Sequence, residues 1–380
     1  MIIGVIAEYN PLHNGHLYQL KKIKEQFPDS TIILVTNGCF TQRGEASIYT
    51  KFDKTVLSIS LGIDLVIELP FVFATQSADF FARGAIEILD ALHIDKLVFG
   101  SECGDIELLK KAALFQKNFE NKNFIKEQLK EGYNYPTILA KALEKENIII
   151  KEPNDILGVC YIREIMNLNS NIEPICIKRT NSYHEKTIKN SIASATSIRF
   201  SLQKKEDISN TVPENTLIYL ENPVFIENFF PLLKYKILME KENIKKYQTV
   251  EEGIENRICK YIVQSNSWEE LIQNVKTKRY TYNKLQRMFL HILCGFTKEE
   301  ANQMQHIEYI RILGFNEKGK NYLKKIKKES KFPIITNYSS LKNNEMLKLE
   351  QRISSIYSLE VKNSNELIQK EFQWNPFIKE

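Results

Sequence analysis

Two histidines near the start of the chain are its most chemically suggestive feature. His13 and His16 flank Asn14 and Gly15 in the stretch HNGH, directly after an apolar run that begins at Ile2. Imidazoles can donate to phosphate oxygens and stabilise the negative charge that builds up on a reacting phosphorus. A glycine permits a tight turn, and a helix that begins there directs free N–H groups and partial positive charge to the same point. We therefore expect a phosphate site in which His13 and His16 are catalytic.

The residues alone leave other roles for this pair open. The two side chains can be loop histidines without a special function, or they can be metal ligands. In zinc peptidases the two histidines share one helical face and a glutamate lies between them, and that arrangement is absent here. We therefore expect no metal site built from protein side chains.

A second candidate phosphate site is the stretch SATSIR, residues 194–199. Ser194 and Thr196 precede Arg199 at a predicted helix start, so hydroxyl, backbone N–H and guanidinium donors can surround a phosphate. A serine or threonine cap followed by a surface arginine is common, so the segment is a weak signal by itself. Together with the histidine pair, at the other end of the same predicted domain, it becomes specific.

Strand-like and helix-like patterns alternate through the first half of the chain. The strand-like runs are residues 2–9, 30–38, 63–71, 95–102 and 171–180. Amphipathic helical stretches separate several of them, as at residues 16–27, 51–62 and 80–94. This alternation is typical of parallel β-α-β units, so we predict an α/β fold with a doubly wound, Rossmann-like parallel sheet. Ligands bind outside the carboxyl ends of such strands, where the histidine loop lies.

The pattern changes near residue 200. The stretches 232–247, 251–263, 281–295 and 317–330 are charged and amphipathic, and a strand-like run follows at 332–340. We predict an ATP-binding domain of residues 1–200 and a mainly α-helical domain of residues 201–380. A helical insertion is expected at residues 115–144.

Two basic clusters occur in the second half. The first surrounds tyrosines and the second is rich in lysine; they comprise Lys278, Arg279, Lys284 and Arg287, and Lys324, Lys325, Lys327 and Lys328. Cations neutralise phosphates and aromatic rings can stack on unpaired bases, so both clusters are candidate RNA contacts. Each can equally be a solvated helix face.

Composition sets broad limits. The chain has 380 residues, enough for two domains, and its net charge of +5 permits an anionic partner without requiring one. Its six cysteines include no C-x-x-C pair, which fits neither a zinc site nor a small disulfide framework. The chain opens on a strand-like run, and no apolar run approaches membrane-spanning length. We expect a cytoplasmic protein without a membrane partner.

Several motifs, taken in order, resemble one family. The strand, H-x-G-H and helix with a distal S-[ST]-T-x-I-R-like segment resemble the nucleotidyltransferases related in fold to class I aminoacyl-tRNA synthetases. The stretches GVIAEYNPLHNGH, NGCFTQRGEASI, GIDLVIELPF, QSADFFARGAI, FGSE, PNDILGVCY, SYHE and IASATSIR are similar to the tRNA(Met) cytidine acetate ligase family. Ala193 and Ala195 depart from the usual isoleucine and hydroxyl residue of that superfamily pattern.

The resemblance implies an activity. Members of that family activate acetate with ATP as acetyl-adenylate, release pyrophosphate, and acetylate the wobble cytidine of elongator tRNA(Met) to N4-acetylcytidine. Magnesium is expected to accompany ATP. The implied ATP contacts are Ala7, Glu8, Tyr9, Asn10, Pro11, Leu12, His13, Asn14, Gly15, His16, Leu17, Tyr18, Gln19, Leu20, Gly100, Asn154, Arg179, Ser194, Thr196 and Arg199, and both basic clusters become candidate tRNA contacts.

Roles at the acceptor end of the site stay open. The loop that contains Gln42, Arg43 and Glu45 has two possible roles. It can line the place where acetate or cytosine binds, since arginine can hold a carboxylate in bidentate fashion, or it can be a solvated loop.

Two other functions also remain. One is a small-molecule adenylyltransferase of the same superfamily, which would not need the basic second half. The other is an RNA-binding protein with a non-catalytic nucleotide site.

Overall fold

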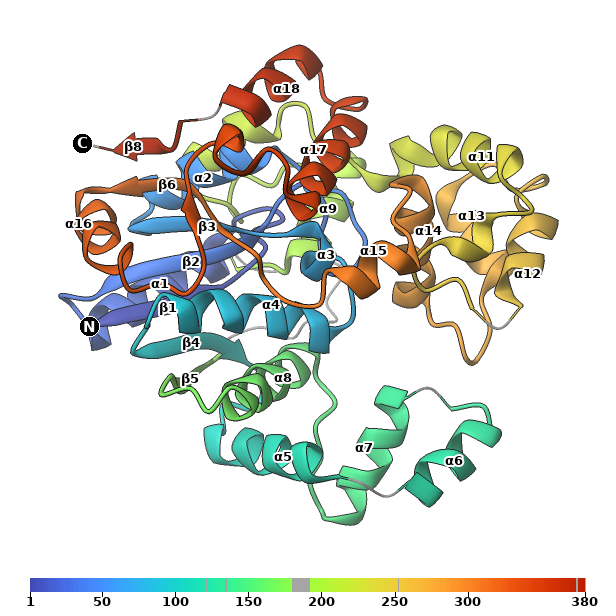
Figure 1. Ribbon diagram of the computed structural model, residues 1–380, viewed down its shortest axis with the longest axis horizontal. Coiled ribbons are helices and arrows are strands. Elements are labelled where there is room, and N and C mark those ends of the chain that lie inside the picture. The colour runs from blue at the N-terminus through green and yellow to red at the C-terminus, as the bar shows by residue number, and fades with distance from the viewer. Residues whose placement is uncertain (120–121, 134, 180–191, 252, 374, 380) are drawn as a thin grey trace.

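An eight-stranded sheet forms the centre of the computed structural model, which describes residues 1–119, 122–133, 135–179, 192–251, 253–373 and 375–379. The strand order is β5-β4-β1-β2-β3-β6-β7, and β8 also pairs with β6 (Figure 1). The strands are β1 (Ile2–Ile6), β2 (Thr31–Asn37), β3 (Leu65–Leu69), β4 (Lys96–Ser101), β5 (Glu173–Lys178), β6 (Ile310–Asn316), β7 (Ile334–Ile335) and β8 (Phe377–Lys379).

Helices surround this sheet and form most of the second half. They are α1 (Asn14–Gln26), α2 (Lys51–Ser60), α3 (Phe71–Ala74), α4 (Ala78–Ala91), α5 (Ile106–Asn118), α6 (Lys122–Lys130), α7 (Tyr135–Lys145), α8 (Pro153–Asn167), α9 (Ala195–Gln203), α10 (Glu214–Leu217), α11 (Phe230–Met239), α12 (Ile254–Tyr261), α13 (Trp268–Val275), α14 (Tyr282–Leu293), α15 (Lys298–Gln303), α16 (Glu317–Ile326), α17 (Glu345–Ser358) and α18 (Ser364–Gln373). None of those in the described part of the chain combines the length and hydropathy needed to cross a bilayer.

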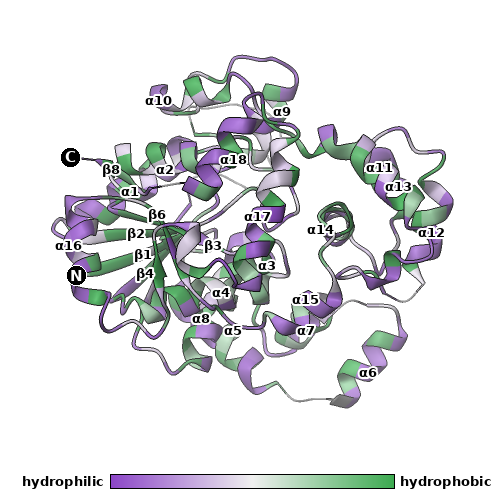
Figure 2. Cartoon of the chain, turned by 45° about the horizontal axis from the view of Figure 1, so that its top comes forward, coloured by the Kyte–Doolittle hydropathy of each residue, from purple (hydrophilic) through white to green (hydrophobic). Residues whose placement is uncertain are grey.

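The predicted α/β fold is confirmed. Strands β1 to β5 are all parallel to one another. Alternate residues of β2 point to opposite faces: Ile32 and Leu34 pack with Leu20 of α1, whereas Ile33 and Val35 belong to the core that includes α4 and α8. Both faces of β2 are therefore covered, which explains its continuous apolar run from Ile32 to Val35. Figure 2 shows hydrophobic residues along the central strands.

The second half is mainly helical, as predicted, but it also completes the sheet. Strand β6 runs antiparallel to β3, and β7 and β8 pair with β6. The strand-like run at 332–340 corresponds to the short β7, while β6 is a strand that the alternation in the first half does not indicate. The residues after 200 therefore contribute to the first-half sheet, and the domain boundary near residue 200 stays a prediction.

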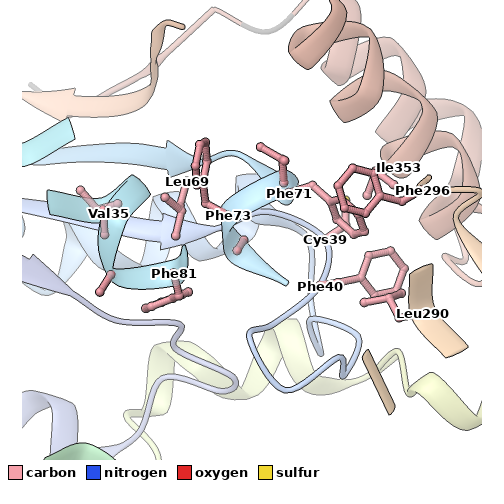
Figure 3. Close-up of a cluster of buried hydrophobic side chains, with 14 of the residues drawn as sticks. Val35, Cys39, Phe40, Leu69, Phe71, Phe73, Phe81, Leu290, Phe296 and Ile353 are labelled. Atoms are coloured by element: carbon pink, nitrogen blue, oxygen red, sulfur yellow. The ribbon is translucent and has the colours of Figure 1, made fainter. Parts of the chain in front are cut away.

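The hydrophobic core is also continuous across that boundary. Phe71, just after β3, lies with its ring centre 6.3 Å from that of Phe40 and 5.6 Å from that of Phe296 (Figure 3). Phe40 in turn contacts Tyr357 of α17, at 5.7 Å between ring centres. Aromatic rings from four distant parts of the chain thus close one end of the sheet.

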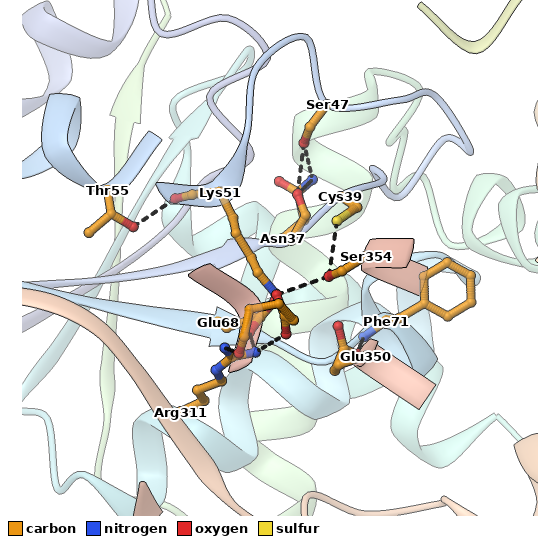
Figure 4. A network of polar contacts seen from close by, with 12 residues as sticks. Asn37, Cys39, Ser47, Lys51, Thr55, Glu68, Phe71, Arg311, Glu350 and Ser354 are labelled. Carbon is orange, nitrogen blue, oxygen red and sulfur yellow. Dashed lines mark hydrogen bonds and ion pairs between the residues drawn. The ribbon is translucent and has the colours of Figure 1, made fainter. Parts of the chain in front are cut away.

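A buried network of charges joins the same regions (Figure 4). Lys51 of α2 contacts Glu68 of β3 at 2.6 Å and Glu371 of α18 at 2.8 Å. Arg311 of β6 contacts the same two carboxylates, at 3.0 and 2.5 Å. Each charge lies within reach of two of the opposite sign, which offsets the cost of removing four charges from water.

Candidate active site

A cavity opens at the carboxyl ends of the parallel strands, where the sequence predicts the ligand. Its walls come from the end of β1, the first turn of α1, the 42–45 loop, β4, α8 and the start of α9. The lining residues are Ile6, Ala7, Glu8, Tyr9, Asn10, His13, His16, Gln19, Gln42, Arg43, Glu45, Phe81, Gly100, Asn154, Leu157, Tyr161, Arg179, Ser194, Ala195, Thr196 and Arg199. The two segments with phosphate-binding potential, 13–16 and 194–199, thus meet in one cavity.

The two histidines cap the helix that follows them and stabilise each other's position. His13 Nδ1 accepts a hydrogen bond from the backbone N–H of Gly15 at 3.0 Å. His16 Nδ1 accepts one from the backbone N–H of His13 at 3.2 Å, and the two rings stack with centres 3.7 Å apart. Because each Nδ1 is an acceptor, the proton of the neutral ring is on Nε2. Both rings therefore keep an Nε2–H donor at the N-terminus of α1.

Burial keeps these rings uncharged. It lowers the pKa of His13 to about 3, with further lowering by Arg179 and Arg199. Burial likewise lowers the pKa of His16 well below its usual range, and His13 and Arg179 add to the effect. The pair is therefore suited to donating hydrogen bonds to phosphate oxygens, and unsuited to supplying a proton near neutral pH.

Position 15 must be a glycine because the ring of His13 lies too close to leave room for a side chain. A Cβ atom added at Gly15 would lie 2.8 Å from Cε1 of the His13 ring, which is closer than real Cβ contacts allow. Any larger residue would push the ring out of its cap. The glycine of H-x-G-H thus keeps the imidazole in place, in addition to permitting the turn.

Three hydrogen bonds fix the loop before the helix. Tyr49 Oη donates to the carbonyl of Tyr9 and accepts from the N–H of Leu12, both at 2.8 Å. Asn10 Oδ1 accepts from the N–H of Ile48 at 2.7 Å. Nothing near Tyr49 in the sequence indicates this role, because its partners lie about 40 residues earlier in the chain.

The SATSIR segment lines the cavity, but its arginine is already engaged. Arg199 forms an ion pair with Glu45 and donates to the carbonyl of Asn10 at 2.6 Å. Ser194 caps α9 by accepting from the N–H of Ser197 at 3.1 Å. Phosphate contacts from Ser194, Thr196 and Arg199 stay predictions, and Arg199 also holds the 42–45 loop against the histidine loop.

Glu102 organises the wall opposite. It accepts a hydrogen bond from the side chain of Asn154, and its Oε1 lies 3.6 Å from Nε of Arg179. That Nε is buried and has no hydrogen-bond partner in the described part of the chain. A buried unpartnered donor at a cavity wall fits the predicted phosphate role of Arg179. Gly100 lies beside Arg179: a Cβ atom added at Gly100 would lie 3.4 Å from Cγ of the arginine.

Not every predicted nucleotide contact faces the cavity. Leu12 and Leu20 are buried in the core between α1 and the sheet. Asn14 donates to the carbonyl of Asn210 at 2.9 Å. Tyr18 and Gly15 line a smaller adjoining recess. The contact range 7–20 therefore divides into cavity residues and residues that support the loop from behind. The SYHE motif at 182–185 lies outside the described residues.

The two basic clusters lie on opposite sides of the molecule. Arg287 of α14 donates to the carbonyl of Gln42, in the loop that lines the cavity, at 3.4 Å. In contrast, Lys318 and Asn316 at the start of α16 contact the backbone of Ser30 and Asp64, which directly precede β2 and β3. Figures 1 and 2 agree, with α16 at the far left and α14 to the right. Only the 278–287 cluster lies next to the cavity.

The side chains that the structure describes do not form a metal cage. Within the described ranges, no three histidine, cysteine or carboxylate side chains gather where they could hold a metal ion. Glu45 and Glu102, two carboxylates of this region, contact Arg199 and Arg179 respectively. The requirement for magnesium stays a prediction.

Comparison with known proteins identifies relatives along the whole chain. A family model described as HIGH Nucleotidyl Transferase matches residues 1–371. The tRNA(Met) cytidine acetate ligase of Caldicellulosiruptor saccharolyticus is 41% identical over 391 residues, covering 98% of this chain and 97% of the relative. That of Anoxybacillus flavithermus is 37% identical over 396 residues, covering 98% and 99%.

Solved structures agree. A crystal structure of Thermotoga maritima TmcAL in an apo form superimposes with a TM-score of 0.92 at 32% identity, covering 99% of both chains. A second, bound with alpha-thio ATP, gives a TM-score of 0.90 at the same identity and coverage. These similarities favour the ligase interpretation over a small-molecule adenylyltransferase or a non-catalytic RNA-binding protein.

Proposed function

This chain belongs to the HIGH nucleotidyl transferase family and, within it, to the tRNA(Met) cytidine acetate ligases, and from this we propose its reaction. It activates acetate with ATP and transfers the acetyl group to the wobble cytidine of elongator tRNA(Met). The observation that carries this proposal is the pair of uncharged histidines, each with an Nε2–H donor, that lines the cavity. A similar protein, Thermotoga maritima TmcAL, was crystallised bound with alpha-thio ATP, which supports a nucleotide as the ligand.

The first step suits this donor set. A carboxylate oxygen of acetate attacks the α-phosphorus, the bond from that phosphorus to the bridging oxygen breaks, and pyrophosphate leaves with the electron pair. No proton moves, so neutral histidines are sufficient. His13 and His16 stabilise charge on the phosphate oxygens through Nε2–H, and Arg179 supplies a positive charge from the opposite wall.

The second step requires a proton acceptor. The exocyclic amine of cytosine attacks the acetyl carbonyl carbon, the bond from that carbon to the phosphate oxygen breaks, and AMP leaves. The amine nitrogen loses one proton. AMP is a good leaving group, so the protein's main contribution is to orient the amine and accept that proton.

Magnesium and RNA enter as further proposals. Since the described residues offer no carboxylate cage, magnesium would arrive on the triphosphate oxygens, the mode in which this ion usually binds. The tRNA would approach over the 278–287 cluster, because that cluster adjoins the cavity loop through Arg287. Since the substrate is an elongator tRNA, the proposed reaction implies a cytoplasmic location.

The test is acetate-dependent exchange of labelled pyrophosphate into ATP without RNA. Wild type is expected to exchange only with acetate, and His16→Ala to lose about 10²–10³-fold of that rate, the usual cost of removing one transition-state donor. Lys21→Ala is the matched control, because Lys21 is exposed on the same helix. Exchange with another small carboxylate but not with acetate would refute acetate as the substrate. Undiminished exchange in His16→Ala would refute the histidine's role.

A further inference from the structure

The cavity has a second end that the nucleotide chemistry does not use. The adjoining recess is lined by His13, His16, Gly100 and Arg179, which are proposed ATP contacts, and by Ile177 and Lys178. The main cavity extends from these residues to Glu8, Gln42, Arg43, Glu45 and Tyr161, none of which lines the recess. Glu8 is an ATP contact only by family resemblance, and its place at this end of the cavity, outside the recess, leaves it available for another role.

Glu8 is an unexpected residue at this place. It follows β1, and its Oε1 accepts the backbone N–H of Gln42 at 2.6 Å. No described residue donates a hydrogen bond to its other oxygen, Oε2. This oxygen is not fully enclosed by protein atoms, so a ligand can reach it. A carboxylate would repel both acetate and triphosphate. It is suited to a ligand group that carries N–H donors.

We propose, on the basis of the function proposed above, that Glu8 hydrogen-bonds the exocyclic amine of the acceptor cytosine and accepts the proton it loses. Carboxylates are the side chains that accept from cytosine N4. The proton moves from the amine nitrogen to Glu8 Oε2 as the new nitrogen–carbon bond forms and the bond from the acetyl carbon to AMP breaks. Glu8 is thus assigned as a catalytic residue of the transfer step.

The surroundings of Glu8 favour this role. Burial raises the pKa of this carboxyl, and the positive charges of Lys54 on α2 and Arg43 on the loop partly oppose the rise, while Glu45 adds to it. Tyr161 of α8 lines the same cavity as Glu8. Burial also lowers the pKa of Lys54, which weakens the positive charge opposite Glu8. A carboxylate made more basic in this way is a better proton acceptor.

A route for the base exists beside this end of the cavity. A neighbouring groove is lined by Glu45 and Arg199 on one side and by Tyr282 and Gln286 of α14 on the other. The next residue of that helix, Arg287, contacts the Gln42 carbonyl. A nucleotide held by the 278–287 cluster would therefore reach the Glu8 end of the cavity before the histidine end.

The decisive variant is Glu8→Gln, which keeps an oxygen for the Gln42 N–H and removes the base. Pyrophosphate exchange with acetate is measured first, and acetyl transfer from preformed acetyl-adenylate to tRNA is measured in single turnover. Glu8→Gln is expected to retain exchange within about threefold and to lose transfer by about 10²–10⁴-fold. Glu25→Gln, an exposed glutamate on α1, is the matched control.

The pH profile separates catalysis from positioning. Transfer by wild type is expected to rise with pH through the raised pKa of Glu8 and then level, and Glu8→Gln should lack that step. Glu8→Asp should keep the pH-dependent step at a reduced rate.

A loss of exchange or a raised KM for ATP in Glu8→Gln would instead make Glu8 a nucleotide contact and overturn the proposal. Undiminished transfer would overturn it equally. A wild type without acetate-dependent exchange would refute the proposed function itself.

Discussion

The histidine pair shows how hydrogen bonding to the backbone determines side-chain chemistry. The spacing in H-x-G-H is sufficient to predict a phosphate site, since a glycine and a helix start are local features. The Nε2–H tautomer follows only from the two backbone donors on Nδ1. Tyr49 and Glu102 are not predictable as parts of the site, because each acts on residues about 40–80 positions away in sequence.

Buried histidines also make the fold sensitive to acid. His291 of α14 is fully buried, with Nε2 3.0 Å from the carbonyl oxygen of Thr75, and burial, aided by Arg287, lowers its pKa to about 3. An unfolded histidine titrates near 6.5, so below that pH the unfolded chain binds a proton that the folded chain does not. The free energy of unfolding should therefore fall as pH drops from about 6.5 toward 3, by about 1.4 kcal/mol per pH unit for each such histidine.

His291→Gln isolates one of these contributions. The amide still offers a donor to the Thr75 carbonyl but does not titrate. Urea unfolding at several pH values between 6.5 and 5 should give a pH slope smaller than that of wild type by about 1.4 kcal/mol per pH unit. The same slope in both proteins would mean that the His291 ring is protonated in the folded state.

At the level of elements, the sequence patterns predict the parallel part of the sheet and the main helices. Each β-α-β unit is local, with an apolar run and an amphipathic helix in sequence order. Strand β6 pairs with β3 across more than 240 residues, and no local pattern specifies that partner. The charges of Lys51 and Glu68 look like ordinary surface charges in sequence until Arg311 and Glu371 are brought beside them.

This network predicts how α18 is held. Burial alone would raise the pKa of Glu371, but Arg311 and Lys51 lower it to about 2, so the carboxylate is charged at neutral pH. Glu371→Gln would leave two buried cations facing Glu68. We expect the free energy of unfolding to fall by about 3–5 kcal/mol, the usual cost of breaking a buried ion pair.

A matched variant lies on the same helix. Glu366→Gln removes an exposed carboxylate paired with Lys370, and should cost less than about 1 kcal/mol. Chemical denaturation of both variants at pH 7 gives the comparison. Equal stability losses would show that the buried network contributes no more than a surface pair.

At the level of the whole molecule, the two basic clusters cannot contribute equally at the cavity. The candidate active site is at the carboxyl ends of the parallel strands, whereas the first turn of α16 contacts residues that precede β2 and β3. Tyr322 and Lys331, on either side of the cluster of Lys324, Lys325, Lys327 and Lys328, contact Leu92 and Asp90, which precede β4. This cluster therefore lies at the amino edge of the sheet, and a strand of five to seven residues spans about 17–24 Å from that edge to the other. Charge counting along the sequence treats the clusters alike, because only the fold assigns them to different edges.

The comparison of two multiple variants tests this assignment. The first replaces Lys278, Arg279 and Lys284 with glutamine and spares Arg287, which contacts the cavity loop. The second replaces Lys324, Lys325, Lys327 and Lys328 with glutamine. The first is expected to weaken tRNA binding, and to reduce the slope of log affinity against log salt by about 0.7–0.9 for each phosphate that the variant no longer neutralises. The second should leave both quantities near wild type.

Pyrophosphate exchange without RNA should be normal in both variants, because neither set touches the nucleotide end of the cavity. Weakened binding in the second variant alone would mean that the tRNA crosses the amino edge of the sheet, and its wobble base would then need another route to Glu8.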